Sequence, residues 1–205
     1  MNQDISSSSV LSSRASFVST AVAVATLIAF GMRATPASAI VAVERDFPEL
    51  VARAEQIVAG TVSDIREDAD AAGGPYTYVT VDQLSVLKGD VGSTLTLRFS
   101  GGSAGAATAR ISDMPAFTLG ERALLFVAGN GSSICPLVGV WQGRFRIRHD
   151  AVRGIDVVED HAGQSINGRE GRQLRRASGK RSSQPALTLD QFRQLVADEL
   201  ATPTR

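Results

Sequence analysis

One serine of the sequence has the local pattern of a hydrolase nucleophile. Residues 101–105 (GGSAG) satisfy the G-x-S-x-G pattern, in which a sharp turn exposes a serine hydroxyl for attack on an ester or amide. His149 or His161, with Asp113 or Asp150, follows Ser103 in the chain and could complete a triad. The pattern functions at a strand-to-helix turn of a large α/β sheet, whereas the residues after Ser103 are rich in glycine and lack helical periodicity. The sequence therefore favours a loop with close backbone contacts, and a small serine hydrolase is the less favoured alternative.

Three arginines lie two residues apart and could together bind an anion. Arg144, Arg146 and Arg148 alternate with apolar residues, so a strand would place their side chains on one face at intervals of about 6.6 Å. Trp141 lies just before them and could supply a stacking surface. These four residues form the candidate binding face, which would suit an oligosaccharide or another polyanion. The alternative is a solvated face on which the arginines pair with carboxylates of neighbouring strands, such as Asp156.

The sequence offers no recognisable metal or cofactor site. A single cysteine and two histidines are too few for the multi-cysteine and cysteine–histidine patterns that hold zinc. The one cluster of carboxylates, Asp64, Glu67, Asp68 and Asp70, lacks the glycine and the glutamate of a twelve-residue calcium loop. We interpret this cluster as a solvated loop, and we expect no catalytic residue, cofactor or metal ion.

Length and charge limit the chain to one globular domain, or one domain with a tail. The 205 residues are 43% hydrophobic and 20% charged, and 21 basic side chains balance 21 acidic ones. This length excludes a large two-domain enzyme. A net charge of zero removes the positive field of a general nucleic-acid binder, so nucleic acid is not an expected partner.

Residues 1–39 have the pattern of a cleavable signal peptide. The run from Phe17 to Met32 carries no charge, and a helix of about 16 residues spans only about 24 Å of the ~30 Å membrane core. The small residues 37–39 (ASA) then match the motif that signal peptidase accepts. We expect cleavage after Ala39 and a secreted or periplasmic protein without a stable membrane span. Retention of the apolar run as an anchor is the alternative.

Closely spaced apolar runs predict a mainly β domain over residues 40–160. A short helix is expected at about 47–55, because Asp46 and Glu49 form a capping pattern around Pro48. Five to seven strands are expected, from the runs 57–65, 76–87, 94–99, 123–127, 134–141, 144–149 and 154–158. The apolar residues of 76–87 change parity at Leu84, which predicts a β-bulge. Without βαβ alternation, these strands predict a small antiparallel OB-like β-barrel.

Two connections of this domain have their own signals. Asn130 and Gly131 are the residues that best tolerate a type I′ turn, so a hairpin is expected between strands 123–127 and 134–141. Residues 101–120 show little periodicity and are expected to form a loop across one end of the barrel. Cys135 lies in an apolar run and is interpreted as a small core hydrophobe.

The C-terminal part is expected to be a linker followed by a helix. Residues 161–186 carry few large apolar groups and many positive charges, which predicts a flexible basic linker. Thr188 and Gln191 form a capping box, and an amphipathic helix is expected at about 189–200 within the segment 187–205. A helix this short is marginal alone, so it must dock on the barrel or on a partner.

Four segments together resemble a group of exported bacterial proteins without assigned activity: AEQIVAGTV, YTYVTVDQLSVLKG, MPAFTLGERALLFV and PLVGVWQGRFRI. The barrel is similar to netrin-like modules, the OB-type barrels that include tissue inhibitors of metalloproteinases. The resemblance covers about residues 50–160 and implies a five-stranded barrel that binds proteins without catalysing a reaction. Those inhibitors place an N-terminal cysteine on the protease zinc, but this chain has no cysteine before Cys135, so no functional residue is carried over.

The function expected from the sequence is therefore that of an exported, non-catalytic binding module. Its partner would be a protein or a component of the cell envelope.

Overall fold

The computed structural model of the protein describes residues 43–69, 73–177 and 184–202. The chain divides into two units, residues 1–36 and 37–205, and every described residue belongs to the second. The expected signal peptide at 1–39 lies outside the described residues. Within the described ranges, no helix has the length and apolar character needed to cross a membrane.

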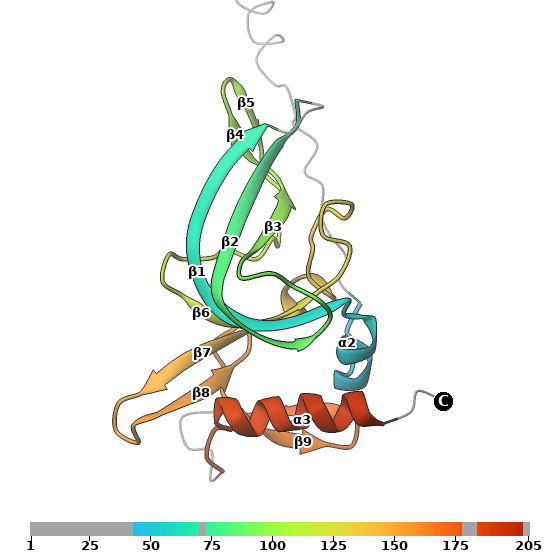
Figure 1. Cartoon of the computed structure of the whole chain (residues 1–205), viewed down its shortest axis with the longest axis vertical. Coiled ribbons are helices and arrows are strands. Elements are labelled where there is room, and N and C mark those ends of the chain that lie inside the picture. Colours follow the sequence, from blue (N-terminus) through green and yellow to red (C-terminus); the bar gives the residue numbers. More distant parts are fainter. Residues whose placement is uncertain (1–42, 70–72, 178–183, 203–205) are drawn as a thin grey trace, which may run out of the picture. The chain divides into compact units, whose positions relative to one another are not determined.

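The described unit is mainly β, and its strands pair antiparallel (Figure 1). The helices are α2 (Phe47–Arg53), the short 3₁₀ helix η1 (Val140–Gly143) and α3 (Leu189–Ala201). The strands are β1 (Gln56–Ala69), β2 (Pro75–Lys88), β3 (Leu95–Ser100), β4 (Gly102–Ala104), β5 (Ala107–Ala109), β6 (Arg122–Val127), β7 (Arg144–Asp150), β8 (Ile155–Glu159), β9 (Ile166–Glu170) and β10 (Gln173–Arg176). The expected antiparallel β fold with an N-terminal and a C-terminal helix is confirmed.

The main sheet has six strands in the order β3-β2-β1-β6-β7-β8, and β4–β5 and β9–β10 form two separate hairpins. Among the described residues, β3 does not pair with β8, so the sheet is not closed into a barrel. The sheet instead curves strongly, because β1 and β2 bend together along their length (Figure 1).

A β-bulge at Gly60, one of three register shifts between β1 and β2, contributes to this bend. The pairing of β1 with β2 shifts in register between Ala59 and Thr61, and Gln83 of β2 has a φ of +51°. Gly60 lies opposite, and a Cβ atom there would stand only 2.6 Å from the carbonyl oxygen of Asp82. Glycine therefore permits the close approach, and the bulge predicted from the parity of β2 is confirmed.

Alternate residues of the central strands fill two different cores, one on each face of the sheet. Leu124 and Phe126 of β6 belong to a first core that also contains residues of α2, α3 and the β9–β10 hairpin. Ala123, Leu125 and Val127 of the same strand belong to a second core, which contains residues of β2 and β3. This division follows from the alternation of side chains along a strand, and it explains why residues 123–127 of β6 are an unbroken apolar run.

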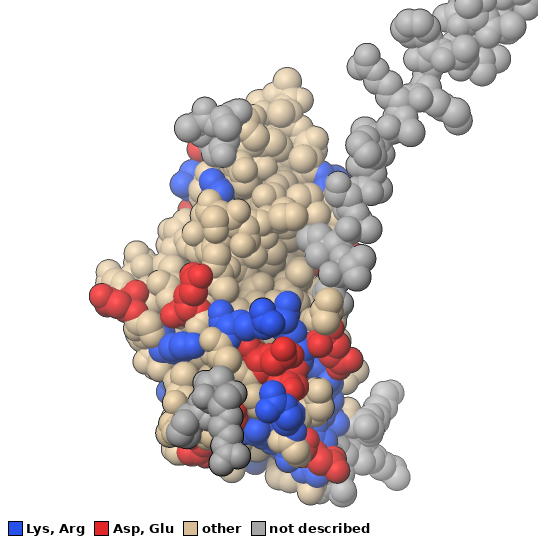
Figure 2. Space-filling model, turned by 90° about the vertical axis from the view of Figure 1, so that its right-hand side faces the viewer, with Lys and Arg blue, Asp and Glu red and all other residues tan. Residues whose placement is uncertain are grey.

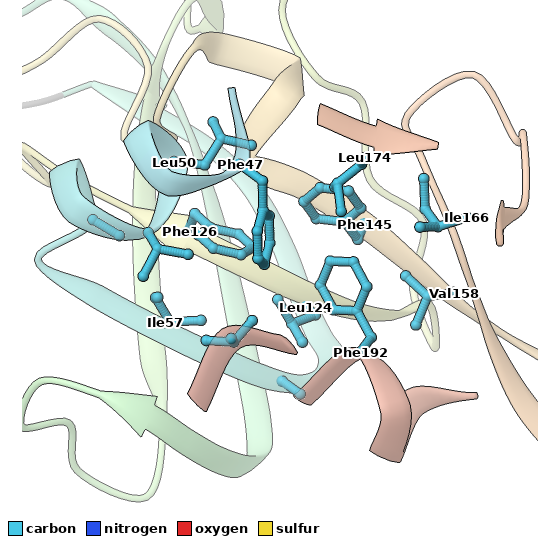
Figure 3. Packing of buried hydrophobic residues seen from close by; sticks show 14 of the residues in the cluster. Phe47, Leu50, Ile57, Leu124, Phe126, Phe145, Val158, Ile166, Leu174 and Phe192 are labelled. Atoms are coloured by element: carbon cyan, nitrogen blue, oxygen red, sulfur yellow. The ribbon is translucent and has the colours of Figure 1, made fainter. Parts of the chain in front are cut away.

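The C-terminal helix docks on the first core. Thr188 forms the predicted capping box, and α3 begins at the next residue. Phe192 of this helix is 0% exposed, and its ring centroid lies 5.8 Å from Phe47 and 4.9 Å from Phe145 (Figure 3). Burial of this apolar face against the sheet supplies the stability that so short a helix lacks alone.

The segment before this helix differs from the expected flexible linker at 161–186. Its described part contains the β9–β10 hairpin, whose Ile166 and Leu174 are buried in the first core. The hairpin also binds α2 through a hydrogen bond from the Phe47 amide to the Arg172 carbonyl. Only one large apolar side chain from each strand reaches the core, so composition could not reveal this element. Residues 178–183 lie outside the described residues.

The expected type I′ turn at Asn130 and Gly131 is wrong. Gly131 has a φ of +86°, but Asn130 is not among the described residues with positive φ. The Asn130 side chain instead contacts the outer side of β3: its Nδ2 donates to Thr96 O at 2.8 Å, and its Oδ1 accepts from Arg98 N at 3.1 Å. The strand expected at 134–141 is likewise replaced by a loop and η1.

The buried ring of Phe192 gives a test of the docked helix. We expect Phe192→Ala to lower the free energy of unfolding by about 3–5 kcal/mol, because it leaves a cavity between two other rings. Urea denaturation measures this loss. The control is Leu200→Ala on the same helix, where the side chain is 38% exposed and a change within about 0.5 kcal/mol is expected. Equal stability of the two variants would contradict the docking of α3.

Candidate binding cleft

Two glycines turn the chain out of β3 and lay the β4–β5 hairpin against β1 and β2. Gly101 and Gly102 have φ values of +97° and +131°, which other residues rarely adopt. A Cβ atom on Gly102 would lie 2.9 Å from Thr77 Oγ1, and this hydroxyl donates to Gly101 O at 2.9 Å. The glycines of the GGSAG segment therefore allow close backbone packing, as the sequence favoured.

This hairpin forms one wall of a cleft of about 480 Å³ that is open to solvent. The other walls come from residues 65–67 of β1, 77–79 of β2 and 99–100 of β3, and from the loop at 110–117. Its main apolar residues are Ile65, Val79, Phe99, Ile111, Met114 and Phe117, and its polar residues include Glu67, Thr77, Ser103 and Arg110. Ligand sites are typically clefts of this size with apolar walls and a few polar groups.

Ser103 lies in this cleft without an imidazole beside it among the described residues. Its amide donates to Glu67 Oε2 at 2.9 Å, and its hydroxyl oxygen accepts from Thr108 Oγ1 at 3.4 Å. Neither His149 nor His161 lines the cleft. The structure therefore does not bring an imidazole to the hydroxyl that the sequence pattern singles out.

Each arginine of the candidate binding face lies beside a carboxylate. Arg144 donates from Nε and Nη2 to Glu121 Oε1 at 3.1 and 2.5 Å, and Arg146 Nε lies 3.9 Å from the same oxygen. Arg148 Nε donates to Glu159 Oε1 at 2.5 Å, and this bond raises the pKa of Arg148 above its ordinary value. The row predicted from the sequence exists, but its positive charge is largely compensated.

Arg144 is a buried part of the fold. Its side chain is only 4% exposed, and its guanidinium lies 4.7 Å from the ring centroid of Phe117. That ring packs against Phe99 at a centroid distance of 5.5 Å. Through Phe117 and Glu121, Arg144 therefore holds both ends of the segment 117–121, which follows the loop at 110–117, against the sheet.

Trp141 is separated from the arginines that remain exposed. Its ring stacks on His161 at a centroid distance of 3.9 Å, and the surface groove that Arg146 and Arg148 line does not include it. Burial lowers the pKa of His161 below its usual 6.5, so the stacked imidazole is neutral at pH 7. The four residues of the candidate binding face do not form one surface.

Charges of both signs alternate elsewhere on the molecule. On the face shown in Figure 2, basic and acidic side chains lie side by side in the lower part, and the upper part is almost uncharged. The described ion pairs also join neighbouring charges of opposite sign: Arg172 Nε donates to Asp46 Oδ2 at 2.6 Å, and Arg176 Nε donates to the buried Asp160 at 2.8 Å. This face offers no continuous basic patch for a polyanion.

The remaining polar candidates of the sequence form no metal site in the part of the chain that the structure describes. No three of its histidine, cysteine, aspartate and glutamate side chains converge to hold an ion. Asp68 Oδ2 pairs with Arg66 at 3.2 Å, and Glu67 binds the Ser103 amide. Asp70 lies outside the described residues. Cys135 packs against the second core, where burial raises the pKa of its thiol to about 11.

The sequence did not predict the cleft as a site. Its walls come from segments that are far apart in the chain, so no local motif describes it. The available signal was the presence of large apolar residues, Met114 and Phe117, in a segment that otherwise has the composition of a loop.

The arginine row permits a comparison of a buried and an exposed member. We expect Arg144→Ala to lower the free energy of unfolding by about 3–5 kcal/mol, because Glu121 would keep a poorly solvated charge without its partner. The Arg148 side chain is 50% exposed, so Arg148→Ala should change the free energy of unfolding by no more than about 1 kcal/mol. Chemical denaturation of both variants measures the difference. A small effect at both positions would contradict the structural role of Arg144.

Labelling with a serine-directed fluorophosphonate probe tests the hydrolase interpretation. We expect the native protein to remain unlabelled, because no described imidazole activates the Ser103 hydroxyl. The Ser103→Ala variant is the control. Strong labelling that disappears in this variant would show that the serine is a nucleophile.

A search for related proteins adds no functional assignment to this geometry. Neither a protein-family model, nor a curated protein, nor a solved structure matches the chain.

Proposed function

We propose that the protein is an exported, non-catalytic binding module that recognises a protein or cell-envelope partner through the cleft beside the β4–β5 hairpin. The cleft itself carries this proposal. It combines apolar walls with a few polar side chains in a volume of about 480 Å³, and none of the described histidines lies beside its serine. Such a site can hold a side chain of a partner, and it lacks the described imidazole that a serine–histidine pair would need for acyl transfer.

The composition of the cleft favours a protein as the partner. Phe99, Phe117, Met114 and Arg110 line it, and aromatic residues, methionine and arginine are the types enriched at protein interfaces. The loop that carries three of them continues to Leu119, which is 62% exposed. A partner could therefore bury apolar surface both in the cleft and along its edge.

The alternative of an oligosaccharide or polyanion binder receives less support. It requires Arg144, Arg146 and Arg148 to face a ligand. However, Glu121 already accepts a hydrogen bond from Arg144 and lies beside Arg146, and Glu159 accepts one from Arg148. An anion would have to compete with these carboxylates. A serine hydrolase is the least supported alternative, for the reason given above.

Export and the relationship to netrin-like barrels remain parts of the proposal. The signal-peptide pattern of residues 1–39 supports a secreted or periplasmic location. The curved antiparallel sheet with the neighbours β3-β2-β1-β6-β7 supports an OB-like relationship, in which an open side takes the place of full closure.

Site-specific photo-crosslinking in the native host tests the proposed function. A photoreactive residue replaces the exposed cleft residue Ala116, the exposed Arg146 of the arginine row, or Val152, which is 96% exposed in the β7–β8 turn. We expect one discrete crosslinked protein from position 116 and none from the control position 152. A crosslink from position 146 alone would favour the arginine face, and the absence of any product specific to position 116 would contradict binding through the cleft.

A further inference from the structure

The outer half of β1, residues 63–69, has an open side. β1 pairs with β2 over almost its whole length, but it pairs with β6 only from Gln56 to Thr61. Val62 then exchanges backbone hydrogen bonds with Gly120 and Glu121. Beyond this point, no described strand pairs with β1 on that side.

The pairing pattern identifies the backbone groups that face this open side. The Arg98 amide of β3 donates to the Asn130 side chain, so it points away from β2. Arg98 and its pairing partner Tyr78 are therefore a pair without mutual hydrogen bonds. Consequently, the N–H and C=O of Tyr78 point toward Arg66 of β1. Backbone groups alternate in direction along a strand. Ile65 and Glu67 therefore present their N–H and C=O groups to the open side, where no described backbone group binds them.

The other ends of the main sheet are covered. On β3, the Asn130 side chain binds both Thr96 O and Arg98 N. On β8, the Val158 amide donates to Leu187 O at 3.1 Å. An uncovered edge is a template for another strand, and proteins usually block such edges. The protein thus blocks the edges of β3 and β8 and leaves that of β1 accessible.

The open edge and the cleft adjoin each other. Ile65 and Glu67, whose backbone faces the open side, also contribute their side chains to the cleft. A strand added here would place alternate side chains in the cleft, which is how strand addition combines backbone affinity with side-chain specificity. The edge is acidic, because Asp64, Glu67 and Asp68 outnumber Arg66 within residues 63–69.

We infer that an extended segment of a partner protein binds as an additional strand along residues 63–69 of β1. One apolar side chain of this segment enters the cleft beside Ile65, and a lysine or arginine two residues away lies beside Glu67. The two-residue spacing follows because both contacts lie on one face of the added strand. This inference rests on the proposed function and specifies how the partner is bound.

Peptide selection and amide hydrogen exchange test the inference. Random ten-residue peptides displayed on phage are selected on the immobilised protein, and we expect them to share an apolar residue and a basic residue separated by one position. Exchange is then followed by NMR with the tightest peptide. The Ile65 and Glu67 amides should exchange about 100-fold more slowly in the complex, because they become hydrogen-bonded. The Arg66 amide, which already faces β2, is the internal control and should be protected in both states.

A charge exchange tests the predicted basic contact. Glu67→Lys should weaken binding of the selected peptide about tenfold or more, because like charges would meet at the edge. A peptide with glutamate in place of its basic residue should restore binding to this variant. Such rescue also shows that the variant is folded, since Glu67 binds the Ser103 amide in the native protein.

The possible contrary results are distinct. Peptides that bind without protecting the Ile65 and Glu67 amides, or a selection that yields no peptide, would overturn strand addition while leaving a crosslink from position 116 intact as support for the proposed function. Loss of that crosslink would overturn the proposed function itself. Protection of both amides in the free protein, with sedimentation as a dimer, would assign the edge to a second copy of this chain and overturn the inference.

Discussion

The bend that β1 and β2 share at Gly60 is the constraint on which the rest of the structure depends. A side chain at this position would collide with the Asp82 carbonyl, so the bulge and its curvature require glycine. The bend carries the outer half of β1 away from β6, whose pairing ends at Thr61. Both the open side of β1 and the cleft beneath the β4–β5 hairpin exist because β1 separates from β6.

Two further arrangements keep the curved sheet in place. On one face, the rings of Phe47, Phe126 and Phe192 join α2, the sheet and α3 in a single core. On the other face, Arg144 contacts Glu121 and Phe117, which fix the loop that borders the cleft. The first arrangement is apolar and contributes most through burial. The second is ionic and contributes mainly by specifying one position of the loop, since a buried ion pair adds little net stability.

Predictions from the sequence succeeded where the signal was local. The capping box at Thr188 and the bulge in β2 each follow from a few neighbouring residues, and both appear in the structure. The predictions failed where a side chain found a distant partner. Asn130 does not turn a hairpin because its amide binds β3 instead. The β9–β10 hairpin was missed because Ile166 and Leu174 are buried in the first core, most of whose residues come from other parts of the chain.

The sequence by itself determined the class of the fold, since strand periodicity, capping residues and glycine positions are properties of adjacent residues. It also determined that arginines recur at alternate positions of one strand. Only the tertiary structure decided that Arg144 is buried against Glu121, that Ser103 lies without a described imidazole, and that one edge of β1 remains uncovered. These properties depend on which distant segments meet, and that depends on the summed burial of both cores, which no local pattern contains.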